Sequence, residues 1–349
     1  MKNTNTSADG IFLSSLFDTV KVRIQLSHEP LYEIVAKKNF LQYTGKKYQV
    51  RSRFGTFAIV ASEKNRTSLT IEGSIPKFLT GQNLIGTEDL LTGTVELIDL
   101  VLLRAGILAA EAEKKRYREG TFQLLRVDYA KHVNCGTPKK ARVFMTALRA
   151  TVASTAYEYS AFNNETVYWG LFSNRRTLRA YNKGLEMEKH ALGDKVYAAT
   201  KLTREAQSMV RFELALRAEE LARLNLRRAS DWKVEVAREL LEDFVKRLLP
   251  LDHKIPDVTG MDLLSPTLRD RLELWLRGCT DAFSRYPGSL SQARREVLLL
   301  TGIDIKNTLS HEEQKAHFQV LDEVMRAGWG YKCWQEKWEK LKAGKSKKP

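Results

Sequence analysis

Apolar and polar residues alternate with the two-residue period of β-strands in several short runs of this chain. The first three runs, Tyr48–Phe54, Phe57–Ser62 and Ser68–Gly73, are separated by turn residues, and they predict a β-meander. Helical spacing follows, and the acidic residues after Thr87 favour a helix start. This helix is predicted to continue to about Arg118.

The middle of the chain alternates strands with helices. The most regular strand, Met209–Arg217, directs its apolar side chains toward a core and its polar side chains the other way. Thr121–Tyr129, Ala156–Ser160 and a hairpin within Glu165–Glu186 are further predicted strands, and residues 187–207 are predicted to be helical. Strands and helices without a regular βαβ rhythm predict an α+β fold with a largely antiparallel sheet.

Beyond about residue 230 the pattern becomes mostly helical. The predicted helices are Trp232–Leu248, Pro266–Phe283, Leu290–Leu300 and His311–Ala327. We therefore divide the chain into three parts. Residues 1–118 form the β-meander plus helix, residues 119–229 form a central α+β region, and residues 230–349 form a helical C-terminal domain.

The charge balance points to an anionic partner. The 349 residues include 57 Lys and Arg against 42 Asp and Glu, which gives a net charge of +15. Nucleic acid is the first choice for such a partner, and an acidic membrane surface or plain solubility are the alternatives. Neither terminus carries a Lys-rich amphipathic helix, so we expect no membrane partner. The lysine-rich tail from Lys332 is predicted to be disordered and to add non-specific DNA affinity.

Targeting and cysteine patterns predict a location in the cytoplasm. Met1–Gly10 lacks a signal-peptide pattern, and the most apolar run, Leu97–Ala110, is too short and too charged for a membrane span. The 3 cysteines are odd in number and widely separated. They therefore form neither a disulfide framework nor a zinc site, which fits a reducing compartment.

The second strand of the hairpin in Glu165–Glu186 has an unusual surface. Its alternation places Thr177, Arg179, Tyr181 and Lys183 on one face. A phenol flanked by two cations suits a tyrosine that attacks a phosphodiester, because the cations hold the phosphate and stabilise its developing charge. The alternative is a half-exposed strand with an ordinary surface tyrosine.

Three carboxylates on or near strands are candidate ligands for Mg²⁺ or Mn²⁺. Asp128 and Glu213 each lie within a strand, where an acidic side chain is disfavoured and costly to bury. Glu186 lies at the end of the tyrosine strand. Oxygen ligands from separate strands suit these metals, which polarise phosphodiesters. The alternative for Asp128 is a salt bridge with Arg126 or another arginine.

The chain lacks the sequence motifs of several other enzyme classes. The chain has no phosphate-binding loop of ATP-driven helicases and no serine-hydrolase or zinc-protease signature. It also lacks the His-hydrophobic-His triplet of the commonest tyrosine nickases. His132 lies close to Asp128 in sequence and is either a further ligand or a packed side chain. Trp169 and Tyr168 are candidates for stacking on nucleic-acid bases, although Trp169 suits the core beneath the hairpin better.

Four segments in order resemble the gene II replication initiators of filamentous bacteriophages and the wider gene II/gene X class of phage and plasmid replication proteins. They are Pro76–Leu90, Leu125-Arg-Val-Asp128, Thr166–Glu186 and Val210-Arg-Phe-Glu213. The resemblance covers about residues 70–230. The helical C-terminus matches only loosely, and the first ~45 residues hardly at all.

The resemblance implies a rolling-circle replication initiator. Such a protein is a metal-dependent, site-specific endonuclease that nicks, and later rejoins, one strand of a double-stranded origin and leaves a 3′-hydroxyl primer. Residues 119–229 would then be the catalytic nickase core, and residues 1–118 would bind the origin and complete the catalytic fold. The implied partners are origin DNA, displaced single-stranded DNA, and a host helicase and polymerase.

By position, the resemblance assigns Tyr181 as the nucleophile and Lys183 as its partner. Asp128 and Glu213 are the implied metal ligands, and the strand pattern adds Glu186 as a weaker third candidate. We expect the cations Arg175, Arg176, Arg179, Arg211 and Lys77 to bind DNA. The alternative functions are a non-enzymatic DNA-binding regulator and an RNA-binding or transposase-like protein.

Overall fold

The structure is a computed structural model of the chain. It describes residues 15–37, 41–44, 47–62, 66–153, 159–162, 165–191, 201–248, 258–277, 279, 281–284, 289–306 and 311–329. The predicted basic tail from Lys332 lies outside the described residues.

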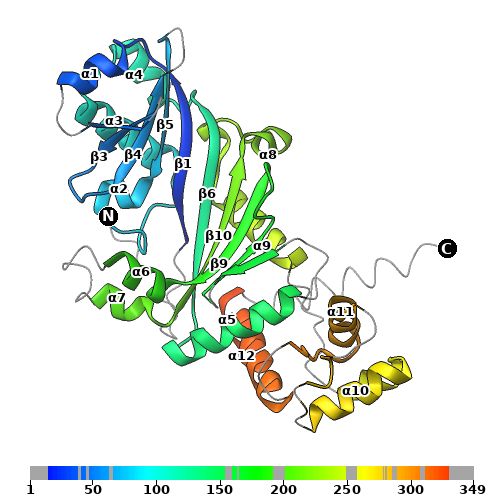
Figure 1. Cartoon of the computed structure of the whole chain (residues 1–349). Coiled ribbons are helices and arrows are strands. Elements are labelled where there is room, and N and C mark those ends of the chain that lie inside the picture. The colour runs from blue at the N-terminus through cyan, green and yellow to red at the C-terminus, as the bar shows by residue number, and fades with distance from the viewer. Residues whose placement is uncertain are drawn as a thin grey trace.

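One antiparallel sheet runs through the described part of the chain, and it contains ten strands in the order β2-β3-β4-β5-β1-β6-β10-β9-β8-β7. The strands are β1 (Ser15–Gln25), β2 (Leu41–Thr44), β3 (Lys47–Arg51), β4 (Phe57–Ser62), β5 (Ser68–Ser74), β6 (Gln123–Asn134), β7 (Tyr159–Phe162), β8 (Thr166–Trp169), β9 (Arg176–Asn182) and β10 (Met209–Arg217). Figure 1 shows the curved sheet with β1 and β6 at its centre. The α+β fold with an antiparallel sheet is therefore confirmed.

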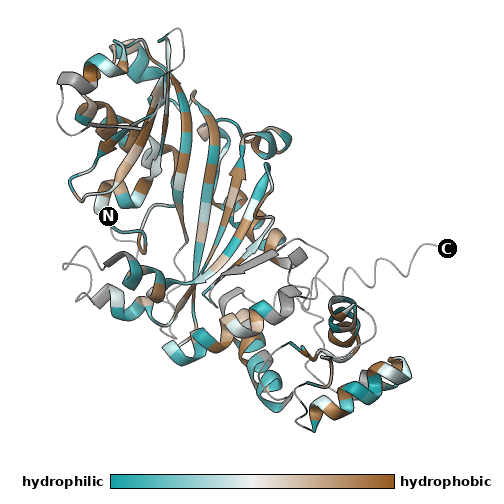
Figure 2. Cartoon of the chain, in the orientation of Figure 1, coloured by the Kyte–Doolittle hydropathy of each residue, from teal (hydrophilic) through white to brown (hydrophobic). Residues whose placement is uncertain are grey.

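Alternation along the strands gives the sheet two different faces. Val22, Val127, Leu178 and Leu214 belong to one continuous apolar core that also contains helix residues such as Phe144. The opposite face of β6, β9 and β10 carries charged and polar side chains. Figure 2 shows the two kinds of residue as alternating bands on these strands. The predicted apolar face of β10 is confirmed, and its polar face is the one on which the candidate site is built.

Helices cover the apolar face and both ends of the sheet (Figure 1). The helices are α1 (Leu31–Lys37), α2 (Ile75–Thr80), α3 (Leu90–Ala105), α4 (Glu111–Arg118), α5 (Pro138–Ala153), α6 (Lys183–Ala191), α7 (Lys201–Ala206), α8 (Ala218–Arg223), α9 (Val234–Leu248), α10 (Pro266–Leu276), α11 (Leu290–Thr301) and α12 (His311–Trp329). Helix α3 packs on β1 and β3, whereas α5 packs on β9 and β10 and is itself covered by α12.

One predicted helix needs correction. The helix predicted from Thr87 to Arg118 is two helices, because Gly106 adopts a left-handed conformation (φ 70°) that ends α3. The first ~45 residues, which gave little signal, contain the long central strand β1. Because β1 pairs with both β5 and β6, the sheet continues across the predicted boundary at residue 118.

The region after residue 230 is helical in its described residues, as predicted. Helices α10 and α11 have a small core of their own, which includes Leu268, Leu272 and Val297. Helices α9 and α12 instead contribute to the main core. Every helix within the described residues is too short or too polar to span a membrane.

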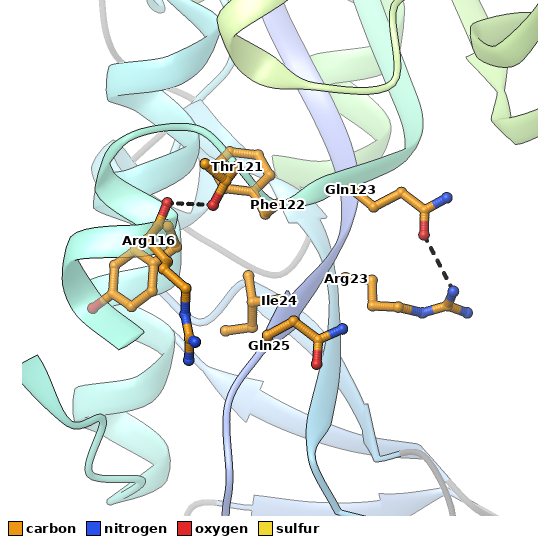
Figure 3. Close-up of a pocket in the computed structure, with 8 residues that line it drawn as sticks. Arg23, Ile24, Gln25, Arg116, Thr121, Phe122 and Gln123 are labelled. Atoms are coloured by element: carbon orange, nitrogen blue, oxygen red, sulfur yellow. Dashed lines mark hydrogen bonds between the residues drawn. The ribbon is translucent and has the colours of Figure 1, made fainter. Parts of the chain in front are cut away.

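A small cavity of about 120 Å³ lies where β1 ends and β6 begins, next to α4 (Figure 3). Arg23 and Gln123 line one side and are joined by a hydrogen bond of 3.2 Å, and Arg116 lines another side. This position is at the opposite end of β6 from His132. None of the side chains that the sequence predicts to be functional lines this cavity.

Candidate active site

The predicted tyrosine and lysine lie at the junction of a strand and a helix. Strand β9 ends at Asn182, whose Oδ1 accepts a hydrogen bond from the Leu185 backbone N–H at 3.1 Å and so caps α6. Lys183 is therefore the first residue of α6 rather than a strand residue, and Glu186 lies one turn along the helix. This geometry corrects the prediction that Tyr181 and Lys183 share a strand face.

The hydroxyl of Tyr181 is directed at a buried carboxylate. It donates a hydrogen bond of 3.3 Å to Glu213 Oε2, and the side chain is only 5% exposed. The Arg179 guanidinium lies 5.2 Å from the centre of the tyrosine ring, and Lys183 Nζ lies 6.0 Å from it. Burial raises the pKa of Tyr181 well above its usual value, so the phenol is protonated in this arrangement.

A second carboxylate, that of Glu186, pairs with two lysines. Lys183 Nζ donates to Glu186 Oε2 at 2.5 Å and to Asn83 Oδ1 at 2.7 Å. Lys77 of α2 pairs with the other oxygen of Glu186 at 3.3 Å. Burial and the neighbouring Arg211 lower the pKa of Lys183 to about 8. Lys183 is thus an ammonium group that changes charge near physiological pH.

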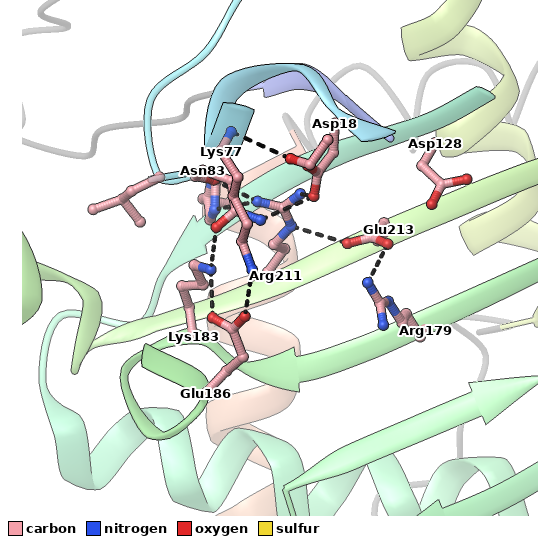
Figure 4. A network of polar contacts seen from close by, with 12 residues as sticks. Asp18, Lys77, Asn83, Asp128, Arg179, Lys183, Glu186, Arg211 and Glu213 are labelled. Atoms are coloured by element: carbon pink, nitrogen blue, oxygen red, sulfur yellow. Dashed lines mark hydrogen bonds and ion pairs between the residues drawn. The ribbon is translucent and has the colours of Figure 1, made fainter. Parts of the chain in front are cut away.

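Arg211 lies in the middle of this network and is fully buried. Its guanidinium donates to Asp18 of β1, to Glu213 at 3.2 Å and to the backbone oxygen of Asn83 at 2.6 Å (Figure 4). Burial opposes ionisation of Asp18, but Arg211, Ser74, Lys77 and Asn83 together lower its pKa to about 2. The arginine therefore ties β1 and the Asn83 loop to the strand that carries Glu213.

The sequence prediction missed Asp18 and Asn83. A signal for Asp18 was present, because it interrupts an apolar strand pattern as Asp128 does. Asn83 lies within a segment that carried the family resemblance, but a loop amide has no periodicity that would mark its role. Both side chains are buried, with exposed fractions of 3% and 5%.

Asp128 forms the ion pair that the sequence offered as an alternative to a metal site. Arg126 donates to both of its oxygens, at 2.8 and 2.7 Å. Burial and the charges of Glu213 and Asp18 raise the pKa of Asp128 to about 7, although Arg126 acts in the opposite direction. A buried carboxylate under repulsion from its neighbours has capacity for a further positive charge.

The three predicted metal ligands do not come together. Asp128 is opposite Ala215 in the β6–β10 register, which makes Glu213 its diagonal neighbour on the same face. Glu186 instead lies with Lys183, on the other side of Arg211 (Figure 4). Within the described residues no group of three His, Cys, Asp or Glu side chains is arranged to hold a metal. Two carboxylates still fit Mg²⁺, which binds through one or two carboxylates together with phosphate oxygens and waters.

The predicted DNA-binding cations have different environments. Arg211 is buried and unable to contact DNA in this arrangement, which corrects its assignment. Arg175 and Arg176 pair with the buried Glu220 of α8 at the far end of β9 from Tyr181. Arg179 is 37% exposed and pairs with Glu213, so it is the predicted arginine that borders both solvent and the site.

The part of the chain that forms the sheet and this network is similar in sequence to a known protein family. Residues 16–235 match the family model that describes the N-terminal part of the replication-associated protein known as gene II protein. This match spans more than half of the chain and reaches every strand of the sheet. The chain belongs to the gene II replication-associated protein family. The family region begins in β1 and ends at the start of α9, so all the side chains of the network lie inside it.

Two individual proteins are also similar to this gene II family member. The gene II replication-associated protein of Enterobacteria phage I2-2 is 27% identical over 249 residues, which cover 70% of this chain and 71% of the phage protein. The solved structure of a rolling-circle replication initiator protein from Geobacillus stearothermophilus is 11% identical, with a TM-score of 0.31. The alignment covers 71% of this chain and 83% of that chain. A score this low adds nothing to the assignment.

His132 and Trp169 are both packed side chains in the structure, which decides between the two roles considered for each. His132 is fully buried, with its Nε2 3.4 Å from a guanidinium nitrogen of Arg211, so it packs beneath the network. Trp169 is 1% exposed and belongs to the core, as its position beneath the hairpin predicted.

Gly184 fixes the distance between α6 and the start of β10. A Cβ atom at this position would lie 2.5 Å from the Gln207 Cα atom, which no side chain tolerates without backbone movement. We expect Gly184→Ala to reduce the free energy of unfolding by about 1–3 kcal/mol, because α6 must shift. Denaturant unfolding measures this, and Lys189→Ala on the exposed side of α6 is the control, with an effect below about 1 kcal/mol. Equal stability of the two variants would contradict the close packing.

Proposed function

We propose that this protein initiates rolling-circle replication by nicking one strand of a double-stranded origin with Tyr181. The observation that carries the proposal is the hydrogen bond from the Tyr181 hydroxyl to Glu213, with Arg179 and Lys183 close to the tyrosine ring. A buried phenol beside a proton acceptor and guanidinium groups has the parts of a phosphodiester nucleophile. Membership of the gene II replication-associated protein family supports the same conclusion.

The chemistry follows from the positions of these groups. Glu213 accepts the phenol proton and releases it to solvent, so that its carboxylate is charged again, and the Tyr181 oxygen forms a bond to the scissile phosphorus. The bond from phosphorus to the 3′-oxygen breaks, and that oxygen takes a proton and becomes the primer hydroxyl. Arg179 and Lys183 stabilise the charge that develops on the phosphate. Because the tyrosyl phosphodiester keeps the bond energy, attack by a 3′-hydroxyl reverses the step and rejoins a strand.

The carboxylates Asp128 and Glu213 are the residues that would hold Mg²⁺ or Mn²⁺. When bound, this ion supplies polarisation of the phosphodiester and stabilisation of the leaving oxygen. Arg126 and Arg179 now neutralise the two carboxylates, and both arginines are partly exposed, with side-chain exposures of 32% and 37%. If Mg²⁺ or Mn²⁺ occupied these carboxylates, Arg126 and Arg179 would be free to pair with DNA phosphates, while the buried Arg211 would stay with Glu213.

Removal of one carboxylate tests this metal site. We expect Asp128→Ala to lower the rate of Mg²⁺-dependent nicking by about 100-fold or more and to raise the Mg²⁺ concentration needed for half-maximal activity. A titration of Mg²⁺ after chelation with EDTA measures both quantities. Nicking by Asp128→Ala with an unchanged Mg²⁺ requirement would contradict the assignment.

Access to the tyrosine is a condition of this mechanism. The loop between α2 and α3 carries Asn83, which bonds Lys183 and Arg211, and Leu84, which packs against Met209. The loop thus contacts two neighbours of Tyr181, whose side chain is only 5% exposed. We infer that origin DNA displaces this loop when it binds. Elongation from the primer would then use a host polymerase and helicase in the bacterial cytoplasm.

The proposal is tested by a nicking assay. Supercoiled DNA that carries the region around the protein's own gene is incubated with the protein and either Mg²⁺ or EDTA. Open-circle product that depends on Mg²⁺ is the expected result. Tight, salt-sensitive binding without cleavage would favour the second function, a non-enzymatic DNA-binding regulator. Two observations favour that alternative. Tyr181 is buried, and each candidate carboxylate is paired with a cation.

Lys183 gives the proposal a pH dependence. Its pKa is lowered to about 8, so its charge is present below that pH and is lost above it. We expect the nicking rate to fall above about pH 8, and we expect Lys183→Arg to shift this fall to higher pH because arginine stays charged.

Lys183→Met removes the positive charge and keeps a long unbranched side chain. It should reduce the nicking rate by about 100-fold or more at pH 7. Lys115→Met removes an exposed lysine of α4 and serves as the control. If Lys183→Met and Lys115→Met nick equally fast, Lys183 has no part in the reaction.

A further inference from the structure

The turn between β3 and β4 combines arginines with aromatic rings on the surface. The Arg53 guanidinium lies 4.5 Å from the centre of the Phe54 ring, and the Arg51 guanidinium lies 5.9 Å from that of Phe57. Phe57 is 45% exposed, and both arginines are exposed. Among the described residues, neither arginine forms an ion pair with an acidic side chain.

This turn is held in one conformation. The Ser52 backbone N–H donates to the Thr56 backbone oxygen at 2.8 Å, and the two hydroxyl groups of these residues are hydrogen-bonded at 2.7 Å. The Phe54 N–H donates to the Ser52 hydroxyl at 3.1 Å, and Gly55 takes the left-handed conformation that the turn needs (φ 81°). The exposed Phe57 ring and the half-buried Phe54 ring are therefore presented by a fixed backbone.

Helix α2 connects the turn to the tyrosine site. The Thr56 hydroxyl donates to the Lys77 backbone oxygen at 2.9 Å, which fixes the turn to α2. The Lys77 side chain in turn pairs with Glu186, the partner of Lys183. Figure 1 shows the β3–β4 hairpin beside α2. The turn that carries Arg53 and Phe54 is therefore joined to the tyrosine site through Lys77 of α2.

Aromatic rings next to guanidinium groups commonly bind single-stranded nucleic acid. Unpaired bases stack on aromatic and guanidinium planes, while the positive charges follow the phosphates. Duplex DNA offers no base faces for stacking, so it would use the arginine charges alone. The chain's net charge of +15 favours either form of DNA, but the rings favour the single strand.

We propose that the β3–β4 turn, through Arg51, Arg53, Phe54 and Phe57, binds the single strand beside the nick by base stacking and phosphate contacts. This inference rests on the proposed nicking function for its biological setting. The binding itself does not depend on cleavage. An enzyme that must keep hold of an opened strand gains from a stacking surface close to its nucleophile.

The test measures binding of the full-length protein to a fluorescein-labelled oligo(dT) and to a duplex of the same length by fluorescence anisotropy. Tyr181→Phe in EDTA serves as the parent protein, because removal of both the proposed nucleophile and divalent ions keeps the DNA uncut. We expect Arg53→Ala/Phe54→Ala to weaken oligo(dT) binding by about tenfold or more and duplex binding by less. The slope of log affinity against log salt should fall by about 0.7 for the lost arginine.

The matched control removes an arginine and an aromatic ring elsewhere. Tyr32 of α1 and Arg277 after α10 are 65% and 75% exposed, so Tyr32→Ala/Arg277→Ala should leave oligo(dT) affinity unchanged. Phe54→Leu keeps apolar volume but removes the stacking plane, and it should still weaken binding. Equal affinities for the hairpin and control variants, or equal losses for oligo(dT) and duplex, would overturn the proposal.

Discussion

Replacing Tyr181 with phenylalanine is expected to abolish nicking, with a fall in rate of about a thousandfold or more. The change removes the proposed attacking oxygen and the hydrogen bond to Glu213, while the ring remains in its place beneath Arg179. The rate of open-circle formation from supercoiled origin DNA measures the effect. A single neutral hydrogen bond is worth about 1 kcal/mol, so the variant should remain folded.

The matched control for this prediction is Tyr168→Phe. Tyr168 lies on the neighbouring strand β8, where it is opposite Arg179 in the register, and its ring is half-buried. This variant should nick at close to the wild-type rate and bind DNA as Tyr181→Phe does. A Tyr181→Phe protein that nicks as fast as Tyr168→Phe would remove Tyr181 from the reaction.

Replacing Arg211 with methionine is expected to reduce the free energy of unfolding by about 3–5 kcal/mol. Methionine fills much of the same volume, but Asp18 and Glu213 remain buried without the guanidinium that they share. The backbone oxygen of Asn83 also loses its donor. The comparison is Arg217→Met on the same face of β10. Among the residues that the structure describes, its half-buried guanidinium donates only to the Thr177 hydroxyl, at 2.9 Å. Denaturant unfolding should show a cost below about 1.5 kcal/mol there.

The pH dependence of this difference identifies its cause. In the wild type the folded pKa of Asp18 is about 2, below the usual 3.8, so the stability from its ionised form is present above about pH 4. That contribution is lost as the pH falls through about 2. The difference between wild type and Arg211→Met should therefore shrink from pH 7 toward pH 2. A difference that stays constant would indicate lost packing rather than an unpaired carboxylate.

The sequence predicted the parts of the fold that depend on local periodicity. Val210, Phe212, Leu214 and Leu216 alternate without interruption, and the structure buries them against helices as expected. Asp128 and Glu213 were recognised because acidic side chains are rare within strands, and they do lie on one face of neighbouring strands. Periodicity fixes which face a side chain takes, and this information is local.

The partners of these side chains depend on contacts between distant segments. The polar strand face of Arg211 predicts a DNA-binding side chain, but β1 brings Asp18 over it from 193 residues away in the sequence. The strand pattern predicts that Glu186 ends the tyrosine strand. In the structure Asn182 caps a helix, and Glu186 lies in its first turn, where it pairs with Lys77. A single sequence carries no signal for which carboxylate a buried arginine will meet.

The most direct test of the central claim is to identify the atom that receives the cleaved phosphate. Wild-type protein would be incubated with Mg²⁺ and a single-stranded origin oligonucleotide that carries sulfur in place of the 3′-oxygen at the mapped nick. The thiol that leaves is a poor nucleophile for rejoining, so the tyrosyl adduct persists. Trypsin cuts after Arg179 and Lys183 and releases the tetrapeptide Ala180-Tyr181-Asn182-Lys183. Mass spectrometry should find this peptide joined to the 5′-phosphate of the cleaved strand. Cleaved oligonucleotide with the phosphate on another residue, or on none, would contradict the account.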